Sequence, residues 1–542
     1  MFKTHGDINI DEISHLVSSG MKYIQGENRS QITLFPVSLD DAVDAENEVR
    51  LIDLFVDSLD LGEFGFKVDF IENGRPAYHP ADLLKLYIYG YLNRVRSSRQ
   101  LEKECKRNVE VFWLLKNLQP DHNTISNFRR DNPKAIKMVF RETVKIAKHF
   151  DLIGGTLIAG DSTKLRAQNS KKNNFNQKKI DRHLEYIENK LAEYNKAMAE
   201  SDGDDKEKIK KEIKKQELRK EGYKQIEQQL KESGQPQVST SDPESRQMIT
   251  RNNITEVAYN IQTSVDAKHN LPFDYLVTNT NDAKAMGNML QRAENILETK
   301  DFTALYDKGY HTGSEFKKAA DLGIDVMVAI PSVASNAPNP DYNVENFAFD
   351  KTNDCYTCPQ GEILTTNGRW HQDKTYRFKR YTTTACKTCP AKPECSKAIC
   401  GKAIQRSEYQ ELVDMNKKRI TENSELYRKR QQIVEHPYGT IKRQWGFSYL
   451  LTKKGINRAS ADVGFIMTVY NLRRIINIIG INELKKYLKS ALLSIFGKMP
   501  LQKLFSGKIS PDVFKHKTTI RFLNVSLNQL YLNQKPTVQF GF

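Results

Sequence analysis

The sequence predicts an α/β protein built around a mixed sheet, with an all-helical N-terminal domain and two insertions. Apolar residues recur at helical spacing from 80 to 150, and short strand patterns alternate with helical ones from 152 to 330. Helical periodicity returns from about 405 to 480. The 542 residues suffice for roughly two to four folding units, so several domains are expected.

The N-terminal domain is predicted over residues 1–150 and is expected to bind DNA. Within PDHNTISNFRR, Asn123 or Thr124 would cap a short helix that carries Arg129 and Arg130 outward. Such a helix can enter a DNA groove, which makes both arginines candidate DNA contacts. A polar surface helix without a DNA role fits the same pattern equally well.

Five strand patterns follow, the first ending on Asp161. Helical patterns at 282–298 and 312–323 separate the last three strands. This order matches a ribonuclease-H-like topology, in which a three-strand meander precedes helix-linked strands, and we expect a catalytic domain from 151–330 and 405–480. The strand patterns span 152–161, 257–266, 273–280, 302–307 and 325–330.

A helical hairpin is predicted over residues 176–233, inserted after the first strand. Its first arm has apolar residues at alternating steps of four and three, which is a heptad pattern. SDGDD supplies a turn before a less regular second arm. A flexible charged linker is the alternative. The heptad positions are Ile180, Leu184, Ile187, Leu191, Tyr194 and Met198.

The charge balance favours a polyanionic partner, with DNA as the first choice. Lys and Arg number 83 against 67 Asp and Glu, for a formal net charge of +16. A solvated basic surface is the alternative, and it applies equally to Arg458, Arg473 and Arg474, which are candidates for tracking a DNA backbone. The apolar stretch 463–481 is interrupted by polar residues, and MFKTHGDINI lacks the pattern of a signal peptide. We therefore expect a cytoplasmic protein without a membrane partner.

Paired cysteines predict a small zinc-ribbon-like insertion over residues 331–404. Two CxxC units can supply four thiolates to one tetrahedral structural zinc ion, and unmetallated thiols are the alternative. Cys395 and Cys400 follow closely, so the four ligands could be drawn from six thiols. The predicted ligands are Cys355, Cys358, Cys386 and Cys389.

Acidic residues end two strands that the predicted topology makes neighbours. Asp161 and Asp307 would present their carboxylates side by side, as oxygen ligands for Mg²⁺ require. Glu435, on the final helical region, would complete an acidic site. Lys442 would share its helix face if the helix continued, although Pro437 is expected to disturb it.

Several segments resemble the bacterial insertion-sequence transposases of the DDE class. They are AGDSTKLRA, DPESR with AYNIQTSVD, TNTNDA, LYDKGYHTG, EHPYGTIKRQWGFSYLLTKKG and VYNLRRIINI, preceded by PAYHPADLLKLYIYGYLNRVRSSRQLE and PDHNTISNFRR, over roughly residues 75–478. The resemblance implies an RNase-H-like transposase that cleaves the ends of its mobile element and joins them to target DNA.

When the motifs of these transposases are matched to this sequence residue by residue, the resemblance implies that Asp161, Asp307 and Glu435 are ligands of Mg²⁺ or Mn²⁺. It implies DNA contacts from the signature residues Tyr427, Arg430 and Lys442. Four residues separate Arg430 from Glu435, where the signature commonly has three.

The resemblance further implies binding to terminal inverted repeats and target DNA, a homodimer or larger assembly on DNA, and a nucleoid location. Residues 405–480 would close the catalytic domain, and 481–542 would form a C-terminal extension. Two rival functions stay open: a nuclease of this fold without strand transfer, and a non-catalytic DNA-binding protein derived from a transposase. Glu422 and Glu425 are expected to be solvated.

Overall fold

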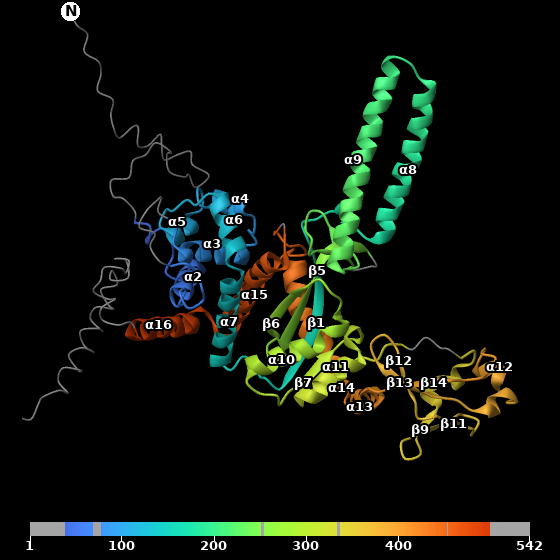
Figure 1. Cartoon of the computed structure of the whole chain (residues 1–542). Coiled ribbons are helices and arrows are strands. Elements are labelled where there is room, and N and C mark those ends of the chain that lie inside the picture. Colours follow the sequence, from blue (N-terminus) through green and yellow to red (C-terminus); the bar gives the residue numbers. More distant parts are fainter. Residues whose placement is uncertain (1–37, 69–76, 251–253, 333–336, 453, 499–542) are drawn as a thin grey trace, which may run out of the picture.

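The computed structural model describes residues 38–68, 77–250, 254–332, 337–452 and 454–498. A six-stranded mixed sheet lies at the centre, and its strands run in the order β4-β5-β1-β7-β8 with β6 paired to β5 (Figure 1). The strands are β1 (Leu157–Arg166), β4 (Arg246–Ile249), β5 (Thr255–Asp266), β6 (Leu271–Thr278), β7 (Thr303–Tyr306) and β8 (Asp325–Val328).

The pairing of these strands confirms the predicted mixed sheet. β1 is antiparallel to β5, and β5 is antiparallel to β6. β1 is parallel to β7, and β7 is parallel to β8. The strands that carry Asp161 and Asp307 are therefore neighbours, as expected.

The first strand differs from its prediction at both ends. It begins at Leu157 because the backbone amides of Gly154 and Gly155 bind the carboxylate of Asp266 in a turn. It continues to Arg166 because β5 pairs with it along that length. Asp161 consequently lies in the middle of β1 and not at its end.

Helices cover both faces of the sheet. The large apolar core joins one face to α7 and α15, while Ala159, Val265 and Leu305 pack on the other face against Val434 of α14. The helices of the sheet domain are α10 (Met286–Leu297), α11 (Gly313–Leu322), α13 (Gln410–Glu422), α14 (Ser424–Tyr438) and α15 (Ile456–Ile479). A π-helix, η8 (Gly439–Gln444), continues α14.

The N-terminal region is helical, as predicted. The N-cap of α6 is Asp121, whose side chain accepts from the amides of Asn123 and Thr124, so neither predicted cap residue holds that position. The helices are α2 (Glu48–Asp57), α3 (Pro80–Leu92), α4 (Ser98–Glu104), α5 (Val109–Leu115), α6 (His122–Asp131) and α7 (Pro133–His149). Residues 1–37 of the predicted domain lie outside the described residues.

The hairpin insertion consists of α8 (Gln177–Glu200) and α9 (Asp204–Ser233), joined at the predicted SDG turn. The two helices form a long arm that projects away from the sheet (Figure 1). Ile180 and Leu230 pack with Phe175 and Val238 at the base of the arm, where β2 (Asn174–Phe175) pairs with β3 (Val238–Ser239). The predicted insertion is helical along both arms.

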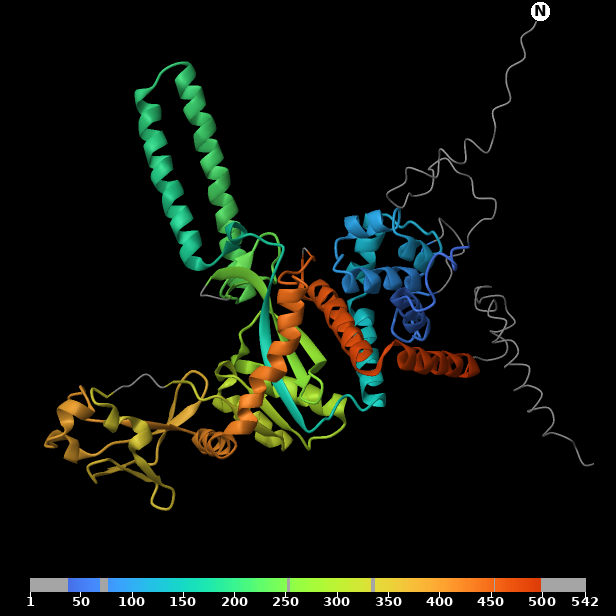
Figure 2. The same ribbon diagram turned by 180° about the vertical axis from the view of Figure 1, so that it is seen from behind.

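The cysteine-rich insertion forms a separate lobe, which we call the cysteine module (residues 337–407; Figure 2). It contains two small sheets, β11-β10-β9 and β12-β13-β14, and a short helix, α12 (Lys392–Cys395). Their strands are β9 (Ala348–Asp350), β10 (Cys355–Thr357), β11 (Ile363–Thr365), β12 (Trp370–Gln372), β13 (Arg377–Tyr381) and β14 (Ile404–Ser407).

The described part of the chain ends in α16 (Ile481–Lys498), and the remainder of the predicted C-terminal extension lies outside the described residues. Among the helices that are described, none combines the length and the apolar character that a membrane-spanning segment requires.

Candidate active site

Asp161 lies on the face of the sheet that α14 covers. Side chains alternate along a strand, so Asp161 and Thr163 share the face of Ala159, which packs in the cluster with Val434. The Nζ atom of Lys442 donates to the Thr163 hydroxyl at 2.9 Å. On this face of β1, Asp161 therefore lies between Ala159, which packs against α14, and Thr163, which binds Lys442 from the segment after α14.

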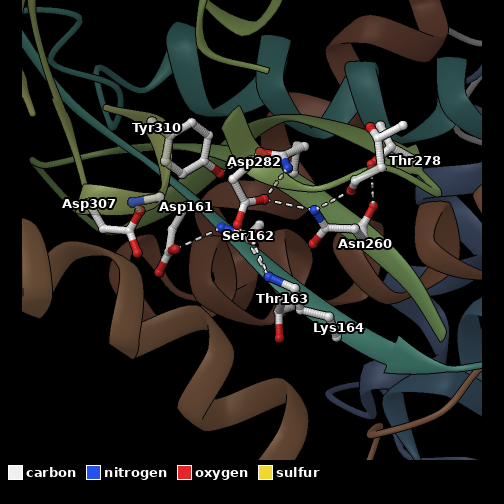
Figure 3. A network of polar contacts seen from close by, with 12 residues as sticks. Asp161, Ser162, Thr163, Lys164, Asn260, Thr278, Asp282, Asp307 and Tyr310 are labelled. Atoms are coloured by element: carbon white, nitrogen blue, oxygen red, sulfur yellow. Dashed lines mark hydrogen bonds and ion pairs between the residues drawn. The ribbon is translucent and has the colours of Figure 1, made fainter. Parts of the chain in front are cut away.

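Asp307 follows β7 directly and caps the short 3₁₀ helix Lys308–Tyr310. Its Oδ1 accepts from the Gly309 amide at 2.8 Å, which fixes the carboxylate at the carboxyl end of the strand. Figure 3 shows the Asp161 and Asp307 side chains close together and directed toward the same side. The structure thus brings two of the three predicted acids together.

Gly160 allows the two strands to approach closely beside this site. The ring of Tyr306 lies over Gly160, and a Cβ atom on Gly160 would be 2.0 Å from Tyr306 Cε1. No side chain fits there without displacing the Tyr306 ring. The glycine therefore sets the spacing of β1 and β7 next to both carboxylates.

The partly buried carboxyl of Asp161 has few partners that stabilise its negative charge. Burial raises its pKa to about 6, despite the Ser162 amide and Arg430, and the negative charges of Asp307 and Asp282 add to the rise. The nearest cation, Arg430 Nη1, lies 3.8 Å from Asp161 Oδ2. A cation between the two carboxylates would relieve this repulsion.

Helix α14 directs three polar side chains of the predicted signature region toward the sheet. The Tyr427 hydroxyl donates to the Tyr306 carbonyl at 2.9 Å, and the Tyr438 hydroxyl donates to the Asp161 carbonyl at 3.3 Å. Arg430 lies between them and approaches Asp161. Tyr438 was not predicted as a site residue, and no spacing in the sequence marked it.

Glu435 lies on the same helix but on its flank. Its side chain is exposed, and Oε1 accepts from Gln431 Nε2 at 2.8 Å. Across the described ranges, no three His, Cys, Asp or Glu side chains are spaced to hold a metal ion as they stand. The third acid is therefore not brought into contact with Asp161 and Asp307.

The helix geometry explains the displaced position of Glu435. Val434 occupies the sheet-facing position one turn after Arg430, and Glu435 follows it by one residue, or about 100° of helical rotation. Pro437 lies inside α14 and does not end it, and the π-helix that follows carries Lys442 back to β1. The expected disturbance thus takes the form of a wider helical turn.

A third acid that the sequence analysis missed, Asp282, lies beside the site. It accepts hydrogen bonds from Asn260 and Gln262 on β5 and pairs with Lys164 at 3.2 Å (Figure 3). Burial alone would raise its pKa, but Lys164 and the hydrogen bonds lower it overall. TNTNDA contains Asp282, but nothing in that segment singled the residue out.

Asp282 reaches the site from the opposite face of β1 to Asp161. Its partner Lys164 is offset from Asp161 by an odd number of residues, and alternation places the two on opposite faces. The oxygens of Asp282 already accept from three side chains. We interpret Asp282 as a positioning residue that holds Lys164, Asn260 and Gln262 in place beside the site.

The predicted DNA contacts of the N-terminal helices divide into two cases. Arg129 does not point outward: it is buried, donates to the Tyr91 hydroxyl at 2.9 Å and lies 3.5 Å from Asp462 Oδ1. The expectation of a DNA contact from Arg129 is corrected, because its charge is committed to the contact with α15. Arg130 is exposed and pairs with Asp131.

The C-terminal arginines are also distinct from one another. Arg473 pairs with Glu48 at 2.8 Å, and Arg474 donates to the His269 carbonyl at 3.0 Å. Both side chains thus connect α15 to other elements, whereas Arg458 is exposed. Of the three, Arg458 retains the open surface that a backbone contact requires.

The cysteine module brings together a different set of thiols from the predicted one. Cys358, Cys386, Cys389 and Cys395 line one cavity. Cys355 belongs to β10 and is buried in that small sheet. Cys105, in the N-terminal helices, is buried, as a helical core thiol would be.

Two family profiles match this chain. One, described as Transposase domain (DUF772), matches residues 37–131, which span α2 to α6. The other, described as Transposase DDE domain, matches residues 357–476, which include Arg430, Glu435 and Lys442. No curated protein matches the chain.

A solved structure, the cryo-EM structure of the piggyBac transposase synaptic complex with hairpin DNA, is similar over 88% of this chain and 89% of that chain. The sequence identity is 10% and the TM-score is 0.27, too low for the likeness to define the fold.

Proposed function

We propose that the chain is a DDE-type DNA transposase, in which Asp161, Asp307 and Glu435 hold divalent cations for cleavage and strand transfer at the ends of its own element. The β-sheet order, with a meander followed by parallel strands, supports an RNase-H-like core for this chemistry. The observation that carries the proposal is the pair of carboxylates on adjacent parallel strands beneath α14.

The donor set fits a hard divalent cation. Carboxylate oxygens are the preferred ligands of Mg²⁺ and Mn²⁺, and the raised pKa of Asp161 reflects burial and neighbouring negative charge that a cation would offset. When bound, such ions stabilise charge on the attacking and leaving oxygens of the phosphoryl group. Glu435 would complete the set from α14, whose flank lies beside the two strands.

The remaining residues would bind and orient DNA. Arg430 Nη1 is buried yet has no hydrogen-bond partner in the described part of the chain, which suits it to donate to a phosphate oxygen of the DNA. Lys442 is held against β1 near Asp161, where its ammonium would lie close to the DNA backbone. Tyr427 fixes α14 to β7 through its hydroxyl and would keep Arg430 in place.

The test is strand cleavage of DNA that carries the inverted repeats flanking the gene. Alanine at Asp161, Asp307 or Glu435 should each reduce Mg²⁺-dependent cleavage by several orders of magnitude, on the order of 10³-fold or more, and leave end binding largely intact. Triple substitution should cost little more than a single one, because the acids act as one unit.

The matched controls are Glu422→Ala, at the end of α13, and Glu425→Ala, on α14, which also carries Glu435. Both variants should cleave DNA at the wild-type rate. Cleavage by the Glu435→Ala variant at the wild-type rate would remove Glu435 from the site, and cleavage by all three variants would remove the catalytic proposal. Pre-cleaved ends distinguish the rival nuclease, which would cut DNA but not join these ends to a target.

A further inference from the structure

Four cysteines of the cysteine module converge from three separate elements. Cys358 follows β10, Cys386 and Cys389 lie in and after the 3₁₀ turn Thr384–Lys387, and Cys395 ends α12. All four line one cavity of about 20 Å³. A cavity this small has room for about one water-sized sphere.

One close contact shows how tightly the chain surrounds the thiols of this cavity. Gly401 has φ +88° and lies against Cys386, so that a Cβ atom on it would be 2.2 Å from Cys386 Cβ. The loop after α12 therefore closes directly over the cavity.

Cys355 does not belong to this group. It lies in the central strand of a three-stranded sheet, opposite Asp350 and Thr365. Cys400 is exposed. The first CxxC unit thus divides, with one cysteine in the strand and the other at the cavity.

The surroundings suit a metal thiolate centre. Zinc with four thiolates carries a net charge of −2, and two lysines, Lys392 and Lys402, line the same cavity. Lys402 is buried and donates to the Tyr342 carbonyl at 3.2 Å, which holds its ammonium there. The two lysines therefore place positive charge beside the four thiols, where a negatively charged centre would need it.

We propose that Cys358, Cys386, Cys389 and Cys395 are the four ligands of a structural zinc ion, with Cys395 in the place that the sequence spacing gave to Cys355. As they stand, the sulfurs form no group spaced to hold an ion, so the proposal requires their side chains to rotate into the shared cavity. A four-thiolate shell leaves no open position, and the ion would act as a cross-link in a module whose core has five buried residues: Phe347, Tyr356, Leu364, Tyr381 and Ile404.

The experiment compares serine variants of the full chain, purified without chelators, by elemental analysis. Wild-type protein, Cys355→Ser and Cys400→Ser should each retain about one zinc per chain. Cys395→Ser and Cys389→Ser should lose most of it. Cobalt substitution adds a direct readout, since thiolate-to-cobalt absorption should weaken in Cys395→Ser and stay unchanged in Cys355→Ser.

Cys395→His separates ligand loss from misfolding, because histidine can restore a fourth ligand and should recover zinc. Loss of zinc in Cys355→Ser with retention in Cys395→Ser would overturn the proposed ligand set. Wild-type protein without zinc and with seven titratable thiols would overturn the site itself. The catalytic variant Asp161→Ala should keep its zinc, so failure here and failure of the transposase mechanism are distinguishable.

Discussion

Two carboxylates of this chain, the buried Asp462 and the partly buried Asp161, are compensated to very different degrees. Asp462 is fully buried, and its oxygens meet the Tyr91 hydroxyl, the Arg129 guanidinium and the Leu451 amide. Asp161 has one backbone amide, an arginine at 3.8 Å and a neighbouring acid. Asp462 therefore connects helices through its hydrogen bonds, whereas the carboxylate oxygens of Asp161 can still bind a ligand.

This contrast teaches that the degree of pairing of a buried charge indicates its role. A structural charge is stable because its partners replace the lost water. A charge that serves to bind a ligand lowers the stability of the folded protein until that ligand is bound. Substitutions at Arg129, Asp161 and Asp282 test whether pairing distinguishes structural from functional charges.

Arg129→Ala should destabilise the chain by about 3–5 kcal/mol, because it leaves the Asp462 carboxylate buried without its cation. Thermal unfolding of the purified protein measures this. Arg130→Ala is the matched control, and its exposed pair with Asp131 predicts almost no change in stability. A stable Arg129→Ala variant with weakened DNA binding would contradict the structural role and restore the DNA role.

Asp161→Asn should do the reverse and stabilise the metal-free protein at pH 8. The folded pKa of about 6 exceeds the ordinary value of 3.8, so ionisation costs folding free energy above about pH 6 and nothing well below about pH 4. Two pKa units correspond to about 3 kcal/mol, and partial exposure reduces the expected gain to about 2 kcal/mol.

Chemical denaturation in EDTA at about pH 8 and about pH 5 checks this sign. The gain from Asp161→Asn should be larger at the higher pH, and Mg²⁺ should stabilise only the wild type. An equal stability of the two proteins at both pH values would show that Asp161 carries no such penalty.

Asp282→Asn should lower stability by about 1 kcal/mol at pH 7, since it removes the charge that pairs with Lys164. The lowered pKa of Asp282 means that this contribution is present at neutral pH and disappears as the pH falls through the folded pKa. Unfolding at about pH 7 and about pH 3 measures the difference. Abolished cleavage with unchanged stability would instead make Asp282 the third catalytic acid in place of Glu435.

Much of the fold followed from local sequence patterns. The alternation in 257–266 and 273–280 predicted β5 and β6, and the heptad spacing predicted the arm of α8 and α9. These elements depend on periodicity and turn residues, which a single sequence displays directly. The boundaries of β1 were wrong because its start depends on Asp266 and its end on β5, both distant in the sequence.

The site residues were predictable only in part. Strand adjacency placed Asp161 beside Asp307, whereas Asp282 was missed because its role depends on Lys164, Asn260 and Gln262 from other segments. Arg129 was wrongly expected to face outward, because the sequence of α6 does not reveal that α15 covers that face with Asp462. Glu435 stays a prediction.

The amino-acid sequence establishes which side chains are available: the acids in and after the strands, the signature residues of α14 and the six cysteines of 355–400. Their partners depend on how the chain folds. The tertiary structure selected Cys395 over Cys355 at one cavity, and it gave Asp462 an arginine while leaving Asp161 beside another acid. The physical reason is that residue type and local spacing set chemical capacity, whereas burial and pairing depend on segments that approach only when the chain folds.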